Sequence, residues 1–337
     1  MSKIYVTGAA GMIGSNLCES LLIGGSRVVG VDNYWRGLPQ TVERLNTREQ
    51  FDFRLADIRF DSSWADDIGV DDIVVHVADI VAGIGYVFNN EFDVYKNNCL
   101  INTAVSSVIA EKRPKKIIYL GTACSYPQGM QRSVTQSVLV ETDKFPADPE
   151  SGYGWSKLMG QVELQLAVKN IDTQLVVLDL HNVYGWPCNY WDPRSQAIPS
   201  LIFRAISNPN DRLVVWGDGR QGRAFVNVQD VVTAVMSAIN YSGAEVEFMI
   251  GPDVCTTIRE IAEIIVSHSS IAIPGVEFDL SKPVGDVGRY ADYSKAKSEL
   301  GWEPTVNIED GVVELIDILI KDAKSRFSNN QFKNIDL

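Results

Sequence analysis

Two segments of the sequence carry residue types whose spacing suits chemistry. Residues 7–14 read Thr-Gly-Ala-Ala-Gly-Met-Ile-Gly, a glycine-rich turn near the start of the chain. Far downstream, Tyr153 and Lys157 stand four positions apart, which on a helix places a phenol and an ammonium on one face. An ammonium beside a phenol favours the phenolate, so we expect a lowered pKa for Tyr153. The pair is therefore predicted to transfer protons, with Tyr153 as base or, in reverse, as acid.

The glycine-rich turn is predicted to hold a dinucleotide. Gly8, Gly11 and Gly14 let the backbone turn tightly and approach a pyrophosphate, toward which the following helix points its amino end. Asp32 closes the second predicted strand, where a carboxylate can accept hydrogen bonds from both ribose hydroxyls and repels a 2′-phosphate. These features predict NAD rather than NADP. The plainer alternative is a tight turn followed by a helix-capping aspartate.

A third group of candidate residues follows the fifth predicted strand. Thr122 would lie near Tyr153 and could hydrogen-bond the reacting hydroxyl or carbonyl. Cys124 follows two positions later and is a candidate second acid/base, although a cysteine after a core strand is usually a small buried hydrophobe. Asp57 and Ile58 follow the third strand and could flank the adenine, or form a solvated turn.

The elements that must position these residues alternate between strand and helix. Apolar runs and helical spacing predict strands at 3–7, 28–31, 51–55, 73–77, 116–120 and 174–178, and helices at 15–23, 98–110 and 152–168. Such alternation predicts an α/β fold with a doubly wound parallel Rossmann sheet, covered on both faces. Residues after about 180 are richer in proline, with apolar elements at 213–215, 231–238, 258–266 and 312–320, and are expected to form a smaller C-terminal α/β substrate lobe over the carboxyl edge of the sheet.

Composition excludes several classes of protein. The 337 residues are 45% hydrophobic and 22% charged, as in ordinary globular proteins, and no apolar run is long enough to span a bilayer. The net charge of −13 argues against a nucleic-acid surface. Five scattered cysteines without a CxxC pair favour reduced thiols over disulfides or a metal site. With the first strand starting at Lys3, these features predict a cytoplasmic protein without a signal peptide or membrane contact.

Taken together, these residues resemble the extended short-chain dehydrogenase/reductase family, which includes NAD-dependent nucleotide-sugar epimerases and dehydratases. The resemblance covers nearly the whole chain and includes His76-Val77-Ala78 and later segments at 181–185, 216–219, 223–226 and 300–302. It implies an NAD-binding domain at 1–179, with 224–245 packing back on it. A nucleotide-sugar lobe at 180–323 and a tail at 324–337 complete the expected organisation.

The resemblance also implies site residues. The predicted cofactor set is Gly8, Gly11, Met12, Ile13, Gly14, Asp32, Asn33, Asp57, Ile58, Val77, Ala78, Asn98, Tyr153, Lys157, Leu180 and Val183. The predicted substrate set is Gly83, Gly85, Asn182, Gln196, Arg204, Trp216, Arg223 and Arg289, with the arginines and Asn182 expected at a nucleotide diphosphate and its ribose. Each arginine could instead be a solvated surface residue, and Trp216, a candidate to stack on the base, could be part of the core.

The loop from Ala123 to Pro127 and the glycine-bearing segment at 78–90 resemble the GDP-mannose 3,5-epimerase and GDP-fucose synthase branch. In that branch the loop cysteine acts as acid/base beside a transient 4-keto group, which implies a GDP-linked sugar here. The sequence departs from that pattern at Gln196, where a lysine or histidine is the second acid/base, and at Asp179, where an arginine is common.

Three interpretations remain open. The leading one is an NAD-dependent epimerase with Tyr153, Lys157, Thr122 and Cys124 as catalytic residues. The loss of an acid/base at Gln196 raises a net dehydrogenase or 4-keto reductase as the alternative, whereas Ala123, in place of an acidic residue, argues against a dehydratase. A non-catalytic NAD-binding scaffold is the third. The resemblance further implies a homodimer formed through the helices near 98–110 and 152–168.

Overall fold

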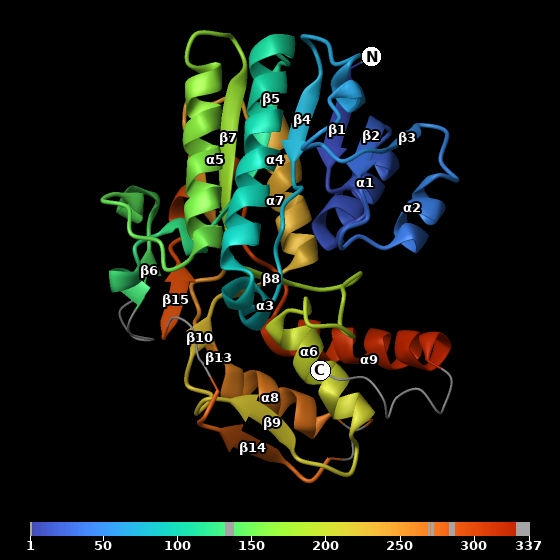
Figure 1. Cartoon of the computed structure of the whole chain (residues 1–337), viewed down its shortest axis with the longest axis vertical. Coiled ribbons are helices and arrows are strands. Elements are labelled where there is room, and N and C mark those ends of the chain that lie inside the picture. Colours follow the sequence, from blue (N-terminus) through green and yellow to red (C-terminus); the bar gives the residue numbers. More distant parts are fainter. Residues whose placement is uncertain (1, 132–137, 269, 271–272, 283–286, 328–337) are drawn as a thin grey trace.

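A computed structural model describes residues 2–131, 138–268, 270, 273–282 and 287–327. A larger part built on a parallel sheet lies above a smaller lobe, and the chain passes between the two parts several times (Figure 1). The strands of the larger part are β1 (Lys3–Thr7), β2 (Arg27–Asp32), β3 (Phe51–Leu55), β4 (Ile73–His76), β5 (Lys116–Thr122), β7 (Gln174–Leu180) and β12 (Glu247–Ile250). Its helices are α1 (Met12–Ile23), α2 (Pro39–Leu45), α3 (Ile84–Asn89), α4 (Glu91–Lys112), α5 (Gly152–Val168) and α7 (Val228–Asn240).

The seven strands of the large sheet run in the order β12-β7-β5-β4-β1-β2-β3, and every neighbouring pair is parallel. The strand order therefore reverses direction between β1 and β4, which is where a doubly wound sheet opens a crevice at its carboxyl edge. The doubly wound Rossmann sheet predicted from the sequence is confirmed.

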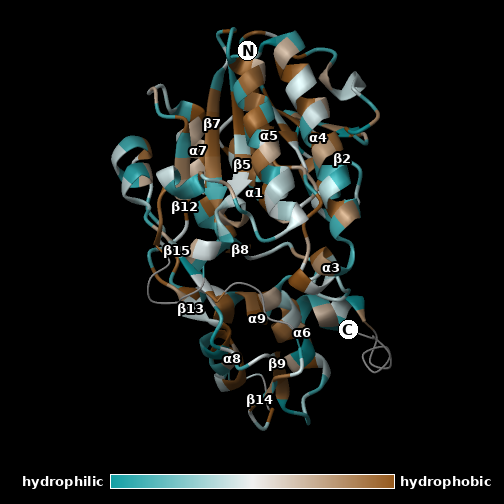
Figure 2. Cartoon of the chain, turned by 60° about the vertical axis from the view of Figure 1, so that its left-hand side comes forward, coloured by the Kyte–Doolittle hydropathy of each residue, from teal (hydrophilic) through white to brown (hydrophobic). Residues whose placement is uncertain are grey.

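Apolar residues alternate between the two faces of this sheet because successive strand residues point in opposite directions. Val6 and Ile118 pack with α1 and α7 on one face, whereas Tyr5 and Ile117 pack with α4 and α5 on the other. Brown hydrophobic residues accordingly follow the strands between the helical layers (Figure 2). Burial on both faces makes the strands a firm support for the loops at their ends.

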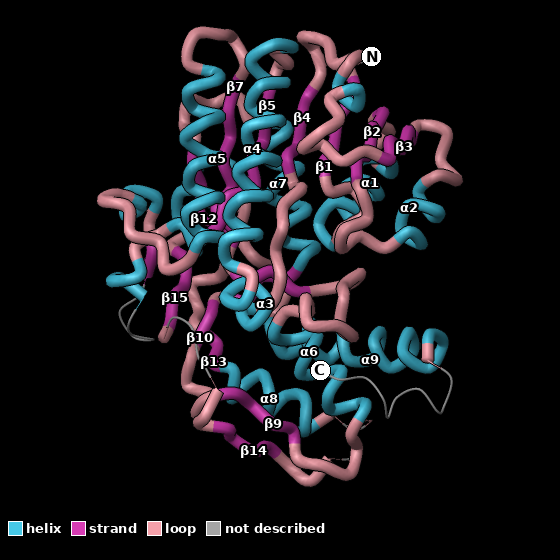
Figure 3. The backbone as a smooth tube through the Cα atoms, viewed as in Figure 1, coloured by secondary structure: helices cyan, strands magenta, loops and turns pink. Residues whose placement is uncertain are grey.

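The smaller lobe has its own apolar core around Phe203, Ile261 and Leu315. Its helices are α6 (Ala197–Ser207), α8 (Ile258–Ser267) and α9 (Ile308–Arg326), and short strands lie beside them (Figure 3). Those strands and the linking ones are β6 (Val138–Leu139), β8 (Asn182–Tyr184), β9 (Leu213–Trp216), β10 (Gly222–Arg223), β11 (Phe225–Asn227), β13 (Thr256–Thr257), β14 (Val276–Asp279) and β15 (Gly288–Ala291).

Three differences between the structure and the sequence prediction concern α6, α4 and β12. Residues 197–207, expected within a loop-rich stretch, form α6, because Ile198, Leu201 and Ile202 give one apolar helical face despite Pro199. The helix expected at 98–110 begins at Glu91 and ends at Lys112. The edge strand β12 is not among the predicted elements. The chain returns to the large sheet through α7, which packs against α1, and then through β12, which pairs with β7 and ends at Ile250.

The expected tail at 324–337 begins within α9, which continues to Arg326, and residues from 328 onward lie outside the described residues. Within the described part of the chain, no helix combines the length and apolar character needed to cross a membrane.

Candidate active site

A cavity of about 770 Å³ lies where the carboxyl ends of the strands meet the smaller lobe. Its walls include the glycine-rich turn, the loop after β4, the ends of β5 and β7, and residues of α6, β9, β10 and β15. Its volume is within the range of small-molecule sites. The lining includes 23 of the residues predicted from the sequence: Gly8, Gly11, Met12, Ile13, Asp32, Asn33, Asp57, Ile58, Val77, Ala78, Gly83, Gly85, Thr122, Cys124, Tyr153, Leu180, Asn182, Val183, Gln196, Arg204, Trp216, Arg223 and Arg289.

The glycine-rich turn is shaped by close backbone approaches. Gly8 has φ of +72°, and a Cβ there would lie 2.9 Å from the backbone nitrogen of Ala78. A Cβ on Gly14 would lie 2.1 Å from the carbonyl oxygen of Gly8, so Gly14 permits the contact between helix α1 and the turn and does not itself line the cavity. Both positions require glycine because any side chain would collide with backbone.

Asp32 holds the same turn from the end of β2. Its carboxylate accepts hydrogen bonds from the backbone N–H of Ala10, at 3.0 Å, and of Tyr34, at 2.7 Å. Burial raises the pKa of Asp32, whereas these backbone donors oppose the rise. Asp57 pairs with Arg59 and accepts from Asn33, and the Arg59 guanidinium lowers the pKa of Asp57 to about 2.

A buried hydrogen-bond chain fixes the loop after β4. The Thr7 hydroxyl accepts from the backbone N–H groups of Val77 and Ala78, so its own proton is available to Nδ1 of His76, 2.8 Å away. Burial lowers the pKa of His76 to about 3, which keeps the imidazole neutral, as this bond requires. Asn98 does not line the cavity; its amide bonds the N–H and the carbonyl of Ile80 and positions the loop from behind.

Tyr153 and Lys157 lie at the start of α5, with Asp79 facing both. The Tyr153 hydroxyl donates to Oδ2 of Asp79 at 3.3 Å, and Nζ of Lys157 lies 3.4 Å from the same oxygen. Burial and then the Asp79 charge raise the pKa of Tyr153 well above its usual range. The expected lowering of this pKa is therefore wrong for the protein alone, because the lysine charge is paired with a carboxylate and the phenol is desolvated.

Thr122 and Cys124 lie at the end of β5, as the sequence predicts. The Thr122 hydroxyl accepts from the backbone N–H of Cys124 at 3.2 Å, which leaves its own proton to offer to a ligand. Nη2 of Arg289 lies 3.1 Å from Sγ of Cys124, and Nη1 donates to Gln131. Arg289, expected at a diphosphate, thus lies against the candidate acid/base thiol.

The glycine-bearing segment meets the smaller lobe directly. A Cβ on Gly83 would lie 2.3 Å from the carbonyl oxygen of Ser195, so glycine permits the segment to reach the loop that carries Gln196. Gly85 lies within α3, and a Cβ there would lie 3.6 Å from the ring of Trp216. Trp216 is 37% exposed and lines the cavity, so it is not part of the lobe's core.

The lobe brings cationic side chains to the cavity. Arg223 and Arg289 are register partners in the parallel pair of β10 and β15, which places them on the same side of that small sheet. Arg204 on α6 donates to the carbonyl of Val214, and its Nε is buried without a hydrogen bond among the described residues. The side-chain carbonyl oxygen of Asn182, at the cavity, is likewise buried without a hydrogen bond among the described residues.

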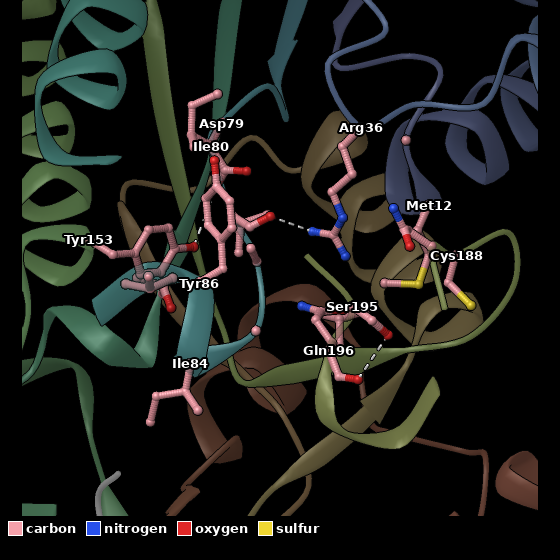
Figure 4. A pocket seen from close by; sticks show the side chains of 18 of the residues that line it. Met12, Arg36, Asp79, Ile80, Ile84, Tyr86, Tyr153, Cys188, Ser195 and Gln196 are labelled. Carbon is pink, nitrogen blue, oxygen red and sulfur yellow. Dashed lines mark hydrogen bonds between the residues drawn. The ribbon is translucent and has the colours of Figure 1, made fainter. Parts of the chain in front are cut away.

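The cavity residues that the sequence did not predict include Arg36, Asp79 and His181. Arg36 follows β2, is partly buried, and donates to the carbonyl of Val81 at 2.7 Å; Figure 4 shows it extending between the Met12 side and the Asp79 side of the cavity. His181 is 5% exposed, and neither ring nitrogen has a hydrogen bond within the described structure. In the sequence, Asp79 directly follows the predicted Ala78, His181 directly precedes the predicted Asn182, and Arg36 comes four positions after Asp32. These positions are what could have drawn attention to them.

Asp179, the other departure from the branch pattern, belongs to a buried network beside the cavity. Its carboxylate accepts from Lys144 at 2.7 Å and from the Tyr126 hydroxyl at 3.0 Å, and Lys144 also pairs with Glu247. Burial next to Glu247 raises the pKa of Asp179, against the opposing charge of Lys144. Asp179 therefore ties β7 to the segment after the Cys124 loop.

No cluster of metal-ligating side chains occurs in the described ranges.

The chain is similar in sequence to known proteins over most of its length. Residues 4–251 match the family model described as the NAD dependent epimerase/dehydratase family. GDP-mannose 3,5-epimerase 1 of rice (Oryza sativa subsp. japonica) is 30% identical, over 92% of this chain and 79% of its own length. GDP-L-fucose synthase 1 of Arabidopsis thaliana is 28% identical, over 96% of this chain and 95% of its own.

Among solved structures, UDP-glucuronic acid 4-epimerase from Bacillus cereus, in complex with UDP-glucuronic acid and NAD, superposes with a TM-score of 0.80 at 27% identity. That superposition covers 95% of this chain and 99% of the other. The match of the family model over most of the chain, the parallel sheet and the glycine-rich turn lead to one conclusion: the chain belongs to the NAD-dependent epimerase/dehydratase family of extended short-chain dehydrogenases/reductases.

Proposed function

We propose that this protein is a nucleotide-sugar epimerase that acts through a transient 4-keto sugar, with a GDP-linked hexose as the favoured substrate. The observation that carries the proposal is the convergence of Tyr153, Thr122 and Cys124 on the cavity that also contains the glycine-rich turn. The GDP preference is supported by the matches to GDP-mannose 3,5-epimerase and GDP-L-fucose synthase.

The cavity residues fit the family's cofactor, NAD. The turn at Gly8 leaves no room for a Cβ, Asp32 presents a carboxylate at the end of β2, and Arg36 supplies a partly buried cation that lines the same cavity. We expect the turn and Arg36 to hold the pyrophosphate and Asp32 to hold the adenosine ribose. When bound, NAD supplies the hydride acceptor and donor for the sugar.

The protein's own groups would manage the protons. Tyr153 takes the proton of the C4 hydroxyl, and Thr122 donates a hydrogen bond to the same oxygen. Oxidation at C4 makes the hydrogens on the adjacent carbons acidic, so Cys124 can remove and return one of them. The guanidinium of Arg289, against Sγ, stabilises negative charge that develops on the thiol or the neighbouring keto oxygen.

The nucleotide is proposed to lie toward the lobe. Arg223 and Arg204 are the candidates for the diphosphate, since planar guanidiniums bind phosphate oxygens well. The half-exposed ring of Trp216 is the candidate surface for stacking of the base. Asn182 and His181 present hydrogen-bonding atoms that no described residue satisfies.

A second candidate function is net oxidation or reduction at C4. It is favoured by one observation: Gln196, an amide that cannot transfer protons usefully at neutral pH, lines the cavity where the related branch has a lysine or histidine. An enzyme with a single proton-transferring group beside the keto sugar could stop after the redox step.

Incubation of the purified protein with GDP-, UDP- and CDP-sugars distinguishes the two candidates. An epimerase yields a sugar of altered stereochemistry, read by NMR, with no net change in reduced-nicotinamide absorbance. A dehydrogenase accumulates NADH, and a reductase consumes added NADH. Binding of NAD without turnover of any sugar would contradict both enzymatic proposals and favour the scaffold.

The homodimer is likewise a proposal. Helices α4 and α5 pack together on one face of the sheet and expose Phe92, Tyr95, Leu100, Trp155 and Leu166. Such apolar side chains on adjacent helices suit an interface between two copies. Light scattering coupled to size-exclusion chromatography measures the mass in solution and tests this.

A further inference from the structure

Asp79 has the geometry of a third member of the proton-transfer group. It stands at the end of the Val77-Ala78 backbone that Thr7 fixes, and its neighbour Ile80 is held by Asn98. The carboxylate reaches Tyr153 and Lys157 through one oxygen, Oδ2. Figure 4 shows Tyr153 and Asp79 facing each other at the cavity. The position of the Asp79 carboxylate is thus set by hydrogen bonds to the backbone on either side of it.

Lys157 is directed at the carboxylate and at a ring face. Its Nζ lies 3.4 Å from Asp79 and 4.5 Å from the centre of the Tyr119 ring. The lysine charge is therefore neutralised in part by Asp79, and the Tyr153 hydroxyl donates its hydrogen bond to the same carboxylate. This arrangement favours a neutral phenol that donates its proton, not a resting phenolate.

We propose that Asp79 is the proton acceptor behind Tyr153, so that Tyr153 acts as a relay between the sugar hydroxyl and the Asp79 carboxylate. The inference rests on the proposed function and assigns a role to a residue outside the Tyr153–Lys157 pair. Asp79 lines the cavity, so its proton can return by the same route.

The step balances as a transfer of two protons and one hydride. The O–H bond at C4 breaks as its proton moves to the Tyr153 oxygen, while the phenolic proton moves to Oδ2 of Asp79. The hydrogen on C4 leaves with its electron pair to the bound NAD, and a C=O bond forms. Reduction reverses each transfer, and the protein regains a carboxylate and a phenol.

Burial explains why a relay suits this site. The titratable groups around the Tyr153 hydroxyl come from four places: Asp79 after β4, Lys157 on α5, Cys124 and Tyr119 at β5, and Arg36 after β2. Burial and the Asp79 charge both raise the pKa of Tyr153, which opposes a free phenolate. A relay moves charge to the carboxylate that already pairs with Lys157 and never requires an isolated phenolate.

The first test needs no sugar. The NAD-loaded protein is titrated by ultraviolet difference spectroscopy, with Tyr153→Phe identifying the signal of this phenol. We expect Tyr153 to remain a phenol through pH 9 and to titrate about one unit lower in Asp79→Asn, because a repelling charge is removed. Asp192→Asn, which changes a cavity carboxylate bound to Arg194, is the matched control and should leave the titration unchanged.

The second test follows the redox half-reaction in single turnover. Asp79→Asn should slow formation of reduced nicotinamide by ~100-fold, within the usual contribution of a positioned proton acceptor, with KM within about threefold of the original. Asp79→Glu should recover part of the rate. A proton inventory in mixed water and heavy water should show two protons in motion in the unmodified protein.

Either of two results overturns the relay: titration of Tyr153 below pH 8 in the unmodified protein, or an Asp79→Asn variant with unchanged titration and rate. Failure of the proposed function is a separate outcome. In that case no sugar is oxidised by any variant, while the Tyr153 titration still decides whether Asp79 and Tyr153 are coupled as the geometry indicates.

Discussion

Sγ of Cys124 and Nη2 of Arg289 lie 3.1 Å apart, although 165 positions separate the two residues in the sequence. The contact joins the end of β5, in the large sheet, to β15, in the smaller lobe. The proposed acid/base thiol therefore meets the guanidinium only where the two parts of the structure come together. Two reactions are proposed for the cavity: oxidation at C4 and proton exchange at the carbon beside it. The contact concerns the second, because Cys124 is the group proposed for proton exchange.

Replacing Cys124 by serine should abolish the second reaction and leave the first. We expect incorporation of solvent deuterium beside C4 to fall by ~100-fold, since a hydroxyl is a far weaker acid than a thiol. Reduction of bound NAD by the sugar should stay within about threefold, because Tyr153 and Thr122 are intact. NMR of the recovered sugar measures the exchange. Cys255→Ser, at a half-buried thiol that does not line the cavity, is the control. Unchanged deuterium incorporation in Cys124→Ser would remove the cysteine from the mechanism.

Gly8→Ala should weaken both the fold and the cofactor site. A Cβ at φ +72° costs about 1–2 kcal/mol, and here it would also lie 2.9 Å from the backbone nitrogen of Ala78. Gly25→Ala is the matched control, because Gly25 has φ of +80° and nothing within 4 Å of a Cβ. We expect Gly25→Ala to lose about 1 kcal/mol in urea unfolding with unchanged NAD affinity. Gly8→Ala should lose more and bind NAD at least ~10-fold more weakly. Equal behaviour of the two variants would show that the contact with Ala78 is irrelevant.

The role proposed for Gly8 could be predicted from the sequence because it depends on the local backbone. The roles proposed for Asp32, Thr122 and the Tyr153–Lys157 pair could likewise be predicted from local sequence patterns. Asp32 and Thr122 end parallel strands, and Tyr153 and Lys157 lie at the start of α5, so their meeting at one edge follows from the parallel topology. The edge strand β12 was not predictable in this way. It is short, and its membership in the large sheet depends on pairing with β7 across a long sequence separation.

The state of the site was less predictable than its membership. The spacing of Tyr153 and Lys157 indicates a charge pair, but the carboxylate that intervenes comes from a loop 74 positions away. Arg289 was placed in the substrate site by resemblance, whereas its contact with Cys124 depends on how β15 seats against the large sheet. Sequence thus indicates which groups gather, and only the fold shows which charge faces which.

Arg36 should contribute to cofactor affinity. The residue is partly buried, lines the cavity with Gly11 and Met12, and donates to the carbonyl of Val81. A charged hydrogen bond to a pyrophosphate is worth about 1.5–3 kcal/mol, so Arg36→Gln should raise the Kd of NAD by ~10- to 100-fold. Arg44→Gln, at an exposed arginine on α2 that pairs with Glu19, should leave it unchanged. Calorimetric titration with NAD measures both, and equal affinities would place Arg36 outside the cofactor site.

His181 should make the protein less stable in mild acid. Burial, with help from Arg289 and Arg223, lowers the pKa of His181 to about 3, whereas the unfolded chain has the usual value near 6.5. Between these values the unfolded state binds more protons, so stability is complete above pH 6.5 and is lost as the pH falls toward 3. From pH 7.5 to 5 this one group should remove about 2 kcal/mol of the free energy of unfolding. His181→Asn should show a correspondingly smaller loss in urea unfolding at the two pH values, because the carboxylates act equally in both proteins. His268→Asn, at a histidine near Asp317 outside the cavity, is the control. An identical loss in His181→Asn and the unmodified protein would show that His181 binds protons in the folded protein as readily as in the unfolded chain, which would contradict the lowered pKa.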